Sequence, residues 1–427
     1  MKKYIPRYAD ESLKKALESM GAVLITGPKW CGKTTTAKQQ SKSILELQDP
    51  DKSESYLQLA DIKPSKLLEG ENPRLIDEWQ MAPKLWDAVR HSVDKRDGEG
   101  LYILTGSTTV DESKIMHSGT GRIHRMKMLP MSLYESGESN GKISLKDLFY
   151  KRDLNIDGIE SDLSFEDLIF AACRGGWPES LNKKTKEQQL FIAKDYIKNI
   201  CESDASTIDG IKRDPGRVIA ILQEYARCVS QLTKHTKMIS EISENYGDIT
   251  ETTFYSYLDA LKRLFIIDNI KGWSPNIRSP NKIKKTEKKE FIDPSIAVAL
   301  LETNPENLVF DTKTFGFIFE TLCIRDLKVY SGPMGGNIFY YNDGRLEADC
   351  IVQLNNGDYG LIEIKLGKNK IDEGAKNLLK LKQLIKEKKK ERKVKIKEPN
   401  FLAVITGENL AYTRKDGVKV IPIGCLK

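Results

Sequence analysis

Short apolar runs alternate with helical patterns over the first third of the chain. Residues 22–26, 74–76 and 101–104 are dominated by apolar, strand-forming side chains. Between the last two runs, residues 82–94 carry apolar side chains at spacings of three and four, which predicts an amphipathic helix. Strands that alternate with helices form a parallel sheet through right-handed crossovers. The pattern therefore predicts a parallel α/β domain over residues 1–150.

The middle of the chain reads first as helices and then as a winged helix. Apolar positions recur at helical spacing from 165 to 232, with a break at 174–179, and predict a helical domain over 151–232. Within 233–300, an amphipathic helix, a turn at Gly247-Asp248 and a helix from about Glu251 have helix–turn–helix proportions, with Thr250 as N-cap. An apolar strand and a hairpin rich in proline, asparagine and lysine follow, as in a winged helix.

Two uses of this winged helix are open. If it binds DNA, early turns of its second helix enter a major groove and the wing lysines meet phosphates. The groove candidates are Thr252, Thr253, Tyr255 and Ser256, and the phosphate candidates are Lys282, Lys284, Lys285 and Lys288. Winged helices also serve as protein–protein modules, and the second helix here is poor in arginine.

The last part of the chain predicts a second α/β domain, over residues 301–427. An amphipathic helix at 313–330 precedes two strands joined by an Asn-Gly turn within Leu346 to Gly367. A long basic helix then runs from Ile371 to about Lys393, with its leucines on one side, and residues 400–406 and 418–423 read as further strands.

Composition limits the class of protein. The 427 residues, 30% charged and 39% hydrophobic, allow two to four globular domains and argue against disorder. The net charge of +7 is modest, but lysines gather at 282–289 and 386–397. Such clusters suggest an acidic partner, most commonly nucleic acid, with solvated loop and helix faces as the alternative.

Cysteine usage and hydropathy indicate a compartment. The seven cysteines are scattered without a CxxC pair, which argues for a reducing compartment and against disulfides or a zinc site. The first residues contain no apolar signal segment, and no apolar run approaches the roughly 20 residues that span a bilayer. We expect a cytoplasmic protein without a membrane partner.

A phosphate-binding loop follows the first strand. The stretch GPKWCGKT fits G-x-x-x-x-G-K-[ST] through Gly27, Gly32, Lys33 and Thr34, between a strand and a helix. Its glycines let backbone N–H groups surround phosphate oxygens, Lys33 reaches the β and γ phosphates of ATP, and Thr34 ligates Mg²⁺. The predicted nucleotide contacts are Gly27, Pro28, Lys29, Cys31, Gly32, Lys33, Thr34 and Thr35.

Two later strands end in side chains suited to hydrolysis. Asp77-Glu78 closes one apolar run: Asp77 would hold Mg²⁺, and Glu78 would orient and deprotonate the attacking water. An isolated Asp-Glu pair is otherwise a helix start or turn. The next strand ends in Thr105-Gly106-Ser107, where a small hydroxyl, assigned to Ser107, could contact the γ phosphate or the water.

These motifs resemble the AAA-type ATPases of archaea and bacteria that carry a C-terminal domain of unknown function. The resemblance rests on YIPRYADESLKKAL, ITGPKWCGKTT, RLIDEWQMAPKLWDAVR, YILTGSTT and GRIHRMKMLPMSLYE. It implies ATP binding and hydrolysis at Lys33, Thr34, Asp77 and Glu78, with Ser107 as sensor. Arg122 matches a recurrent family arginine, which would act as a finger in cis or, in a homo-oligomer, across a subunit boundary. The alternative is a salt-bridging surface arginine.

The last domain carries a second cluster. Glu320, Asp349, Glu363 and Lys365 follow the order helix, strand, strand, which resembles the PD-(D/E)XK nuclease superfamily and its restriction-endonuclease-like fold. In that chemistry the carboxylates Glu320, Asp349 and Glu363 hold Mg²⁺ beside a phosphate, and Lys365 positions the attacking water. The alternative is a nuclease-like fold used only for packing or binding.

The register of the hairpin decides whether the cluster can form. Glu363 and Lys365 share a face because they are two residues apart. A two-residue Asn356-Gly357 loop would place Asp349 on the other face. A three-residue loop with Gly357 in the left-handed region pairs Leu354 with Asp358 and brings Asp349 opposite Glu363. We predict this second register.

The sequence thus predicts a multidomain α/β protein with ATP and Mg²⁺ as ligands. Our preferred hypothesis is Mg²⁺-dependent ATP hydrolysis coupled to a task on nucleic acid, DNA being the candidate. The alternative is a nucleotide-switched regulatory or scaffold protein that binds protein partners and whose nuclease-like domain is inactive.

Overall fold

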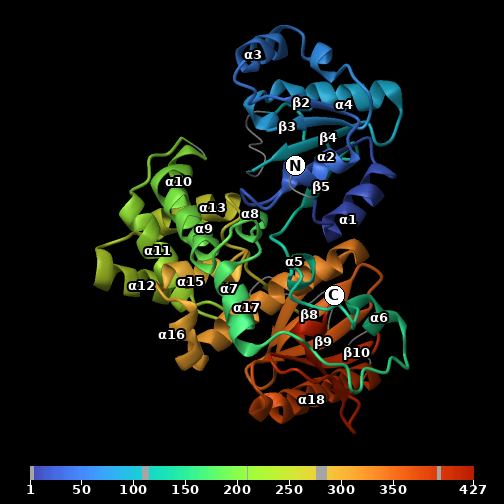
Figure 1. Cartoon of the computed structure of the whole chain (residues 1–427), viewed down its shortest axis with the longest axis vertical. Helices are drawn as coiled ribbons and strands as arrows, with labels where there is room; N and C mark the ends of the chain where they lie inside the picture. The colour runs from blue at the N-terminus through green and yellow to red at the C-terminus, as the bar shows by residue number, and fades with distance from the viewer. Residues whose placement is uncertain (1–3, 108–114, 209, 276–285, 392–395) are drawn as a thin grey trace. The chain divides into compact units, whose positions relative to one another are not determined.

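A computed structural model describes residues 4–107, 115–208, 210–275, 286–391 and 396–427 (Figure 1). The chain divides into two compact units, each with its own sheet. The first comprises residues 1–130 with 263–265, and the second comprises 131–262 with 266–427.

The first unit is built on a parallel sheet, as the alternating pattern predicts. The strands lie in the order β2-β3-β4-β1-β5, and every pairing is parallel. They are β1 (Ala22–Thr26), β2 (Ser43–Glu46), β3 (Arg74–Asp77), β4 (Tyr102–Gly106) and β5 (Ile123–Lys127). The helices are α1 (Tyr8–Leu17), α2 (Lys33–Gln40), α3 (Ser53–Ile62) and α4 (Lys84–Arg96).

Both faces of this sheet are buried. Along β1, Leu24 packs with Trp86 of α4 in one apolar cluster, whereas Val23 packs with Leu13 of α1 in another. Alternate side chains of a strand point to opposite faces, so an unbroken apolar strand is expected where helices cover both sides. The carboxyl ends of β1, β3 and β4 are the edge at which such a sheet presents a ligand site.

The second unit begins with helices. They are α5 (Leu133–Ser136), α6 (Leu145–Tyr150), α7 (Phe165–Arg174), α8 (Pro178–Leu181), α9 (Lys186–Asn199), α10 (Ala205–Thr207), α11 (Pro215–Arg227), α12 (His235–Tyr246), α13 (Glu251–Arg263), α15 (Pro294–Leu300) and α16 (Pro305–Phe310). The predicted helical stretch and the break at 174–179 agree with α7 to α11. Within the described ranges, no helix combines the length and apolar character needed to cross a membrane.

A mixed sheet in the order β11-β12-β10-β9-β8-β7-β6 forms the rest of this unit. Its strands are β6 (Lys271–Gly272), β7 (Gly336–Asn342), β8 (Glu347–Leu354), β9 (Tyr359–Lys365), β10 (Phe401–Thr406), β11 (Tyr412–Thr413) and β12 (Lys419–Pro422). Helix α18 (Ile371–Lys390) lies along one face (Figure 1), where Leu378 and Leu381 pack against Leu361. Helix α17 (Thr312–Ser331) contacts β7, β8 and β9.

The β8–β9 hairpin has the predicted register. The amide of Leu354 donates to the carbonyl of Asp358 at 2.8 Å, and Gly357 has φ +83°. Cys350 pairs with Ile362, so one step further along the ladder Asp349 stands opposite Glu363. The three-residue loop is therefore confirmed.

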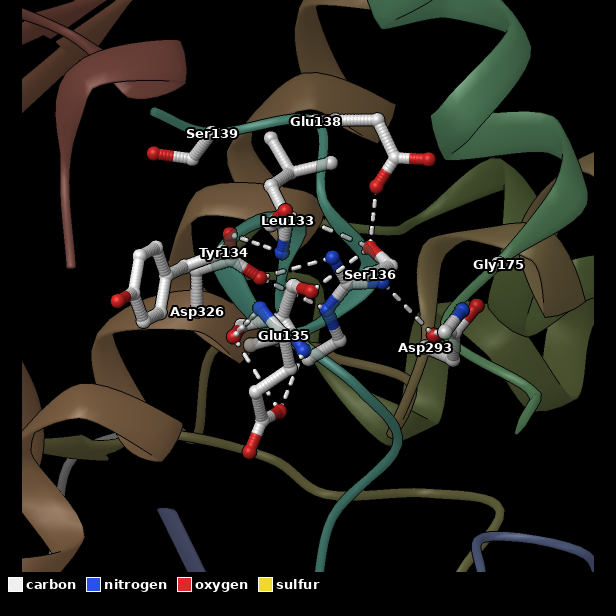
Figure 2. Close-up of polar contacts among 12 residues, drawn as sticks. Leu133, Tyr134, Glu135, Ser136, Glu138, Ser139, Gly175, Asp293 and Asp326 are labelled. Carbon is white, nitrogen blue, oxygen red and sulfur yellow. Dashed lines mark hydrogen bonds and ion pairs between the residues drawn. The ribbon is translucent and has the colours of Figure 1, made fainter. Parts of the chain in front are cut away.

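Residues 131–150 belong to the second unit, so the unit boundary lies about twenty residues before the domain boundary predicted at 150. Figure 2 shows why: the amide of Leu133 donates to the Asp326 carboxylate of α17 at 3.0 Å. Asp326 in turn pairs with Arg325, which also binds Asp293, and all three side chains are buried. Most residues of the predicted helical, winged-helix and C-terminal domains lie in the second unit, whereas residues 263–265 of the predicted winged helix belong to the first. The division into these three domains stays a prediction.

Candidate functional site

The phosphate loop joins β1 to α2 in the geometry that its sequence predicts. Gly27 and Gly32 have φ values of +148° and +100°, in the region that favours glycine. A Cβ on Gly27 would lie 2.2 Å from the carbonyl oxygen of Met128, so this position has no room for a side chain. Trp30 also has a positive φ, +65°, and is 47% exposed.

Lys33 is buried inside the loop. Its ammonium donates to the carbonyls of Gly27 at 3.0 Å and Pro28 at 2.8 Å. These bonds keep a positive charge at the start of α2, where backbone N–H groups also favour an anion. The arrangement fits the phosphates of a nucleotide, whose oxygens would take over the lysine from the two carbonyls.

Two hydroxyls meet the Asp77 carboxylate at the end of β3. Thr34 donates to Asp77 Oδ1 at 2.8 Å, and Thr105 of β4 donates to the same oxygen. A hydroxyl beside a carboxylate at a phosphate loop is the donor set that Mg²⁺·ATP requires, so these residues fit the metal. The structure brings together the residues predicted from the loop and from the Asp-Glu pair.

Glu78 occupies a strained position next to Asp77. Its φ is +54°, its amide donates to the Thr105 hydroxyl at 3.4 Å, and its carboxylate accepts from the side-chain amide of Gln80. Burial raises the pKa of Glu78 above its usual value, and Asp77 adds to this while Gln80 and Lys33 oppose it. A carboxylate with a raised pKa is a better proton acceptor, as a general base requires.

Sequence reasoning did not assign the roles of two residues of this site. Thr105 links Asp77 to the Glu78 backbone, a role that its place at the end of an apolar strand could have suggested. Arg7 is buried and donates to the carbonyls of Cys31 at 2.9 Å and Leu129 at 2.8 Å, thereby bracing the loop from behind. Only the quoted YIPRYADE motif contained a signal for it.

The positions of the other predicted nucleotide-site residues do not by themselves indicate a role in nucleotide binding. Ser107 is buried just beyond β4, and Cys31 is buried with its thiol 3.9 Å from the Met128 carbonyl. Thr35 is exposed in the first turn of α2. Arg122 pairs with Asp94 through a 2.6 Å contact on the surface, which corresponds to the salt-bridge alternative for this arginine within one chain.

The middle region follows the predicted helix–turn–helix order. Thr250 caps α13, since its hydroxyl accepts from the Thr253 amide at 3.2 Å. Tyr255 is exposed, whereas Ser256 is half-buried and accepts a bond from Arg213. The winged helix stays a prediction, and Lys282, Lys284 and Lys285 lie outside the described residues.

In the second unit, Asp349, Glu363 and Lys365 meet on the β8–β9 hairpin. The Lys365 ammonium lies 2.9 Å from Asp349 Oδ2 and 2.6 Å from Glu363 Oε2. Asp349 Oδ2 also accepts from the Ile364 amide at 2.8 Å. Gly374 of α18 approaches closely, because a Cβ there would lie 3.2 Å from the Glu363 Cβ.

Lys288 completes this cluster from a distant part of the sequence. Its ammonium pairs with Glu320 of α17 and lies 3.9 Å from Asp349 Oδ1. Lys288 is only 7% exposed, so the prediction that it contacts phosphates from an exposed wing is wrong. The segment that contains Lys288 forms a β-bridge with Ile270, and the Glu320 and Asp349 carboxylates stabilise the buried charge of the lysine.

Burial sets the pKa values of the distal carboxylates apart. It raises the pKa of Glu363 to about 9, helped by the charge of Asp349, and that of Glu320 to about 8 against the opposing charge of Lys288. Burial opposes ionisation of Asp349 too, but Lys288 and Lys365 outweigh it and lower its pKa. Asp349 is therefore the ionised centre of the cluster.

The distal cluster fits a resident metal less well than the phosphate loop does. Across the described part of the chain, no three histidine, cysteine or acidic side chains are arranged to hold a metal ion. At this hairpin each carboxylate already faces an ammonium group. The metal-ligand roles assigned to Glu320, Asp349 and Glu363 stay predictions.

Family comparisons divide the chain into three. Residues 19–137 match the model of an AAA domain, residues 165–307 a domain of unknown function (DUF8612), and residues 315–426 another (DUF4143). The uncharacterized proteins Mb2031c of Mycobacterium bovis and Rv2008c of Mycobacterium tuberculosis are each 24% identical over 365 residues, covering 84% of this chain and 73% of theirs.

Among solved structures, a Walker-type ATPase of Pyrococcus abyssi is similar at a TM-score of 0.42 and 15% identity, over 70% of this chain and 96% of its own. A signal-transduction ATPase with a tetratricopeptide repeat sensor from Pyrococcus horikoshii is similar at a TM-score of 0.22 and 12% identity, over 76% of this chain and 48% of its own. The AAA match spans the parallel sheet and the loop described above. Residues 19–137 of this chain are therefore similar to an AAA domain, and they contain the phosphate-binding loop.

Proposed function

We propose that the chain hydrolyses ATP with Mg²⁺ at the ends of β1, β3 and β4. The observation that carries this proposal is the Thr34–Asp77 hydrogen bond with Glu78 beside it. Magnesium, held by Thr34 and Asp77, would neutralise charge on the β and γ phosphates. No other pair of strand ends in the first unit offers this donor set among the residues described.

Three side chains would have separate roles in hydrolysis. Lys33 leaves the Gly27 and Pro28 carbonyls for the phosphate oxygens, where its charge stabilises the transition state. Glu78, fixed by Gln80, orients the attacking water and accepts its proton. Thr105 keeps Asp77 and the Glu78 backbone in register.

Binding of ATP by Lys33→Ala, with Lys38→Ala as a matched control, tests the proposal. Lys38 lies on the same helix but is exposed and pairs with Glu46 at the surface. Lys33→Ala should weaken ATP binding at least about tenfold and abolish turnover, because it removes the one buried charge in the loop. Equal affinity and turnover in the two variants would refute an ATP site here.

We further propose that hydrolysis serves a task on nucleic acid, through the winged helix and the nuclease-like C-terminal domain. The exposed lysines near the end of α18, Lys386, Lys389 and Lys390, support this proposal. Charge reversal at these three should weaken DNA binding and flatten its salt dependence. Reversal of the exposed lysines of α9 is the control, and equal effects would argue for nonspecific attraction.

A second candidate function is a nucleotide-switched scaffold that binds protein partners and cleaves nothing. The pairing of every distal carboxylate with an ammonium group favours it. Nicking of DNA with Mg²⁺ or Mn²⁺ separates the two candidates. Cleavage that disappears in Asp349→Ala while ATP turnover persists would exclude the scaffold, and intact DNA under all conditions would exclude the nuclease.

A further inference from the structure

The distal carboxylates are held by two lysines from different parts of the second unit. Lys365 belongs to the same strand as Glu363, as the D…ExK order requires. Lys288 comes from the segment that precedes α15, some sixty residues before Asp349, and has no counterpart in that order. The position of Lys288 is therefore not explained by the D…ExK order.

The two lysines share Asp349 between them. Oδ2 faces the ammonium of Lys365 at 2.9 Å, and Oδ1 faces that of Lys288 at 3.9 Å. Lys288 also pairs with Glu320, so its ammonium stands between a carboxylate of α17 and one of β8. A cation that joins these two carboxylates is what the predicted metal site would require at this point.

One position cannot hold Lys288 and a divalent cation together. Unit charges about 4 Å apart interact strongly even at an intermediate effective dielectric constant, and the repulsion from a dication is twice as large. Both side chains of the Lys288–Glu320 pair are nearly buried, at 8% and 12% exposure, so little water screens the repulsion. The lysine and the metal are therefore competitors.

The cluster nevertheless keeps capacity for a ligand. Glu363 is fully buried, and neither of its carboxylate oxygens makes a hydrogen bond of standard geometry, although Oε2 lies close to Lys365. A buried acceptor without such a bond is costly unless a cation or a donor compensates it. Lys365 compensates Oε2, so Oε1 is the oxygen of Glu363 left to face a further cation once Lys288 no longer opposes one.

We propose that Lys288 is a built-in counter-cation that occupies the metal position of the nuclease-like cluster and excludes divalent cations from it. The segment 286–291, which carries Lys288, thereby keeps Mg²⁺ and Mn²⁺ out of the cluster. The inference rests on the nuclease-like cluster of the proposed function but is independent of ATP hydrolysis.

The test is Mn²⁺ binding to the full-length chain by isothermal titration calorimetry. All proteins carry Thr34→Ala, which removes the hydroxyl ligand at the phosphate loop and so isolates the distal site. Lys288→Met, which keeps the apolar stem without the charge, should bind one Mn²⁺ per chain at least about tenfold more tightly than the parent. Adding Asp349→Asn should abolish the gain.

Lys328→Met is the matched control, since Lys328 also pairs with an acid, Asp268, but lies two turns beyond Glu320 on α17. It should bind Mn²⁺ no better than the parent. A parent that already binds Mn²⁺ tightly, with loss in Asp349→Asn, would overturn the proposal even if Lys288→Met failed to fold. Absence of binding in a folded Lys288→Met would overturn it as well.

Nuclease assays keep this inference distinct from the proposed function. Mn²⁺ binding gained by Lys288→Met without DNA cleavage supports the counter-cation and refutes only the nuclease. Cleavage by the parent that requires Asp349 refutes the counter-cation and supports the nuclease. The two proposals therefore fail on different measurements.

Discussion

Replacing Glu78 with glutamine isolates the charge of the proposed base. Glutamine keeps a side-chain oxygen that accepts the Gln80 bond, and it has the same length, so the contacts seen around Glu78 survive. The positive φ of this residue costs the two side chains equally. What disappears is the ability to accept a proton from water.

The size of the effect follows from that loss. General-base catalysis contributes about 10²–10⁴-fold, equivalent to about 3–5 kcal/mol of barrier. We expect Glu78→Gln to lower kcat for ATP hydrolysis by that factor and to leave ATP affinity within about twofold. Because burial raises the pKa of Glu78, turnover of the wild-type chain should also fall when this carboxyl becomes protonated on acidification.

Steady-state phosphate release and equilibrium ATP binding are the two assays. A Glu78→Gln chain that turns over above about a tenth of the wild-type rate would refute the base assignment. Loss of ATP binding together with turnover would show instead that Glu78 supports the loop. Gln80→Ala, which removes the positioning bond, should lower kcat less than Glu78→Gln. It should also move the acidic limb of the pH profile to higher pH, because the Gln80 bond lowers the pKa of Glu78.

Four further substitutions, in three experiments, test other parts of the structure. Thr105→Val should lower kcat about tenfold, with a higher Mg²⁺ requirement, because Asp77 loses a donor; unchanged Mg²⁺ dependence would contradict this. Gly176→Ala should destabilise the second unit by about 2 kcal/mol or more, because its Cβ would lie 2.1 Å from the Met131 carbonyl oxygen. Gly316→Ala, in open space on α17, should instead stabilise this unit by about 0.5–1 kcal/mol. Urea denaturation of the two variants measures both changes in the free energy of unfolding. The folded state holds the proton of the Glu363 carboxyl more tightly than the unfolded state, so the stability of the wild-type chain falls as the pH rises from about 4.5 to 9. Glu363→Gln should reduce this dependence of stability on pH.

The sequence was most informative where function depends on local geometry. The span of β1, the start of α2 at Lys33 and the strand end at Asp77 follow from glycine and apolar patterns within a few residues. The hairpin register follows from one residue, Gly357, because only its left-handed conformation closes a three-residue loop. Each of these predictions needed only neighbours in the chain.

Predictions failed where partners are distant in sequence. Lys288 looked like one more surface lysine of a basic wing, and nothing near it indicates the carboxylates of α17 and β8. Arg7 reaches the Leu129 carbonyl across more than a hundred residues. Such contacts arise from the fold as a whole, so no local period or motif could have identified them.

The Leu133–Asp326 bond changes where the chain can be divided. A fragment of 151–427 would lack the Leu133 amide that Asp326 binds and the Ile143–Leu426 bridge. The buried carboxylate would lose a donor, at a cost of about 1–3 kcal/mol. Cutting between Pro130 and Met131 instead leaves each piece with its own sheet and keeps residues 131–150 with the second, although residues 263–265 of the first unit are then separated from it. Residues 131–150, which the motif pattern assigns to the ATPase, should therefore travel with the other half when the two are produced apart.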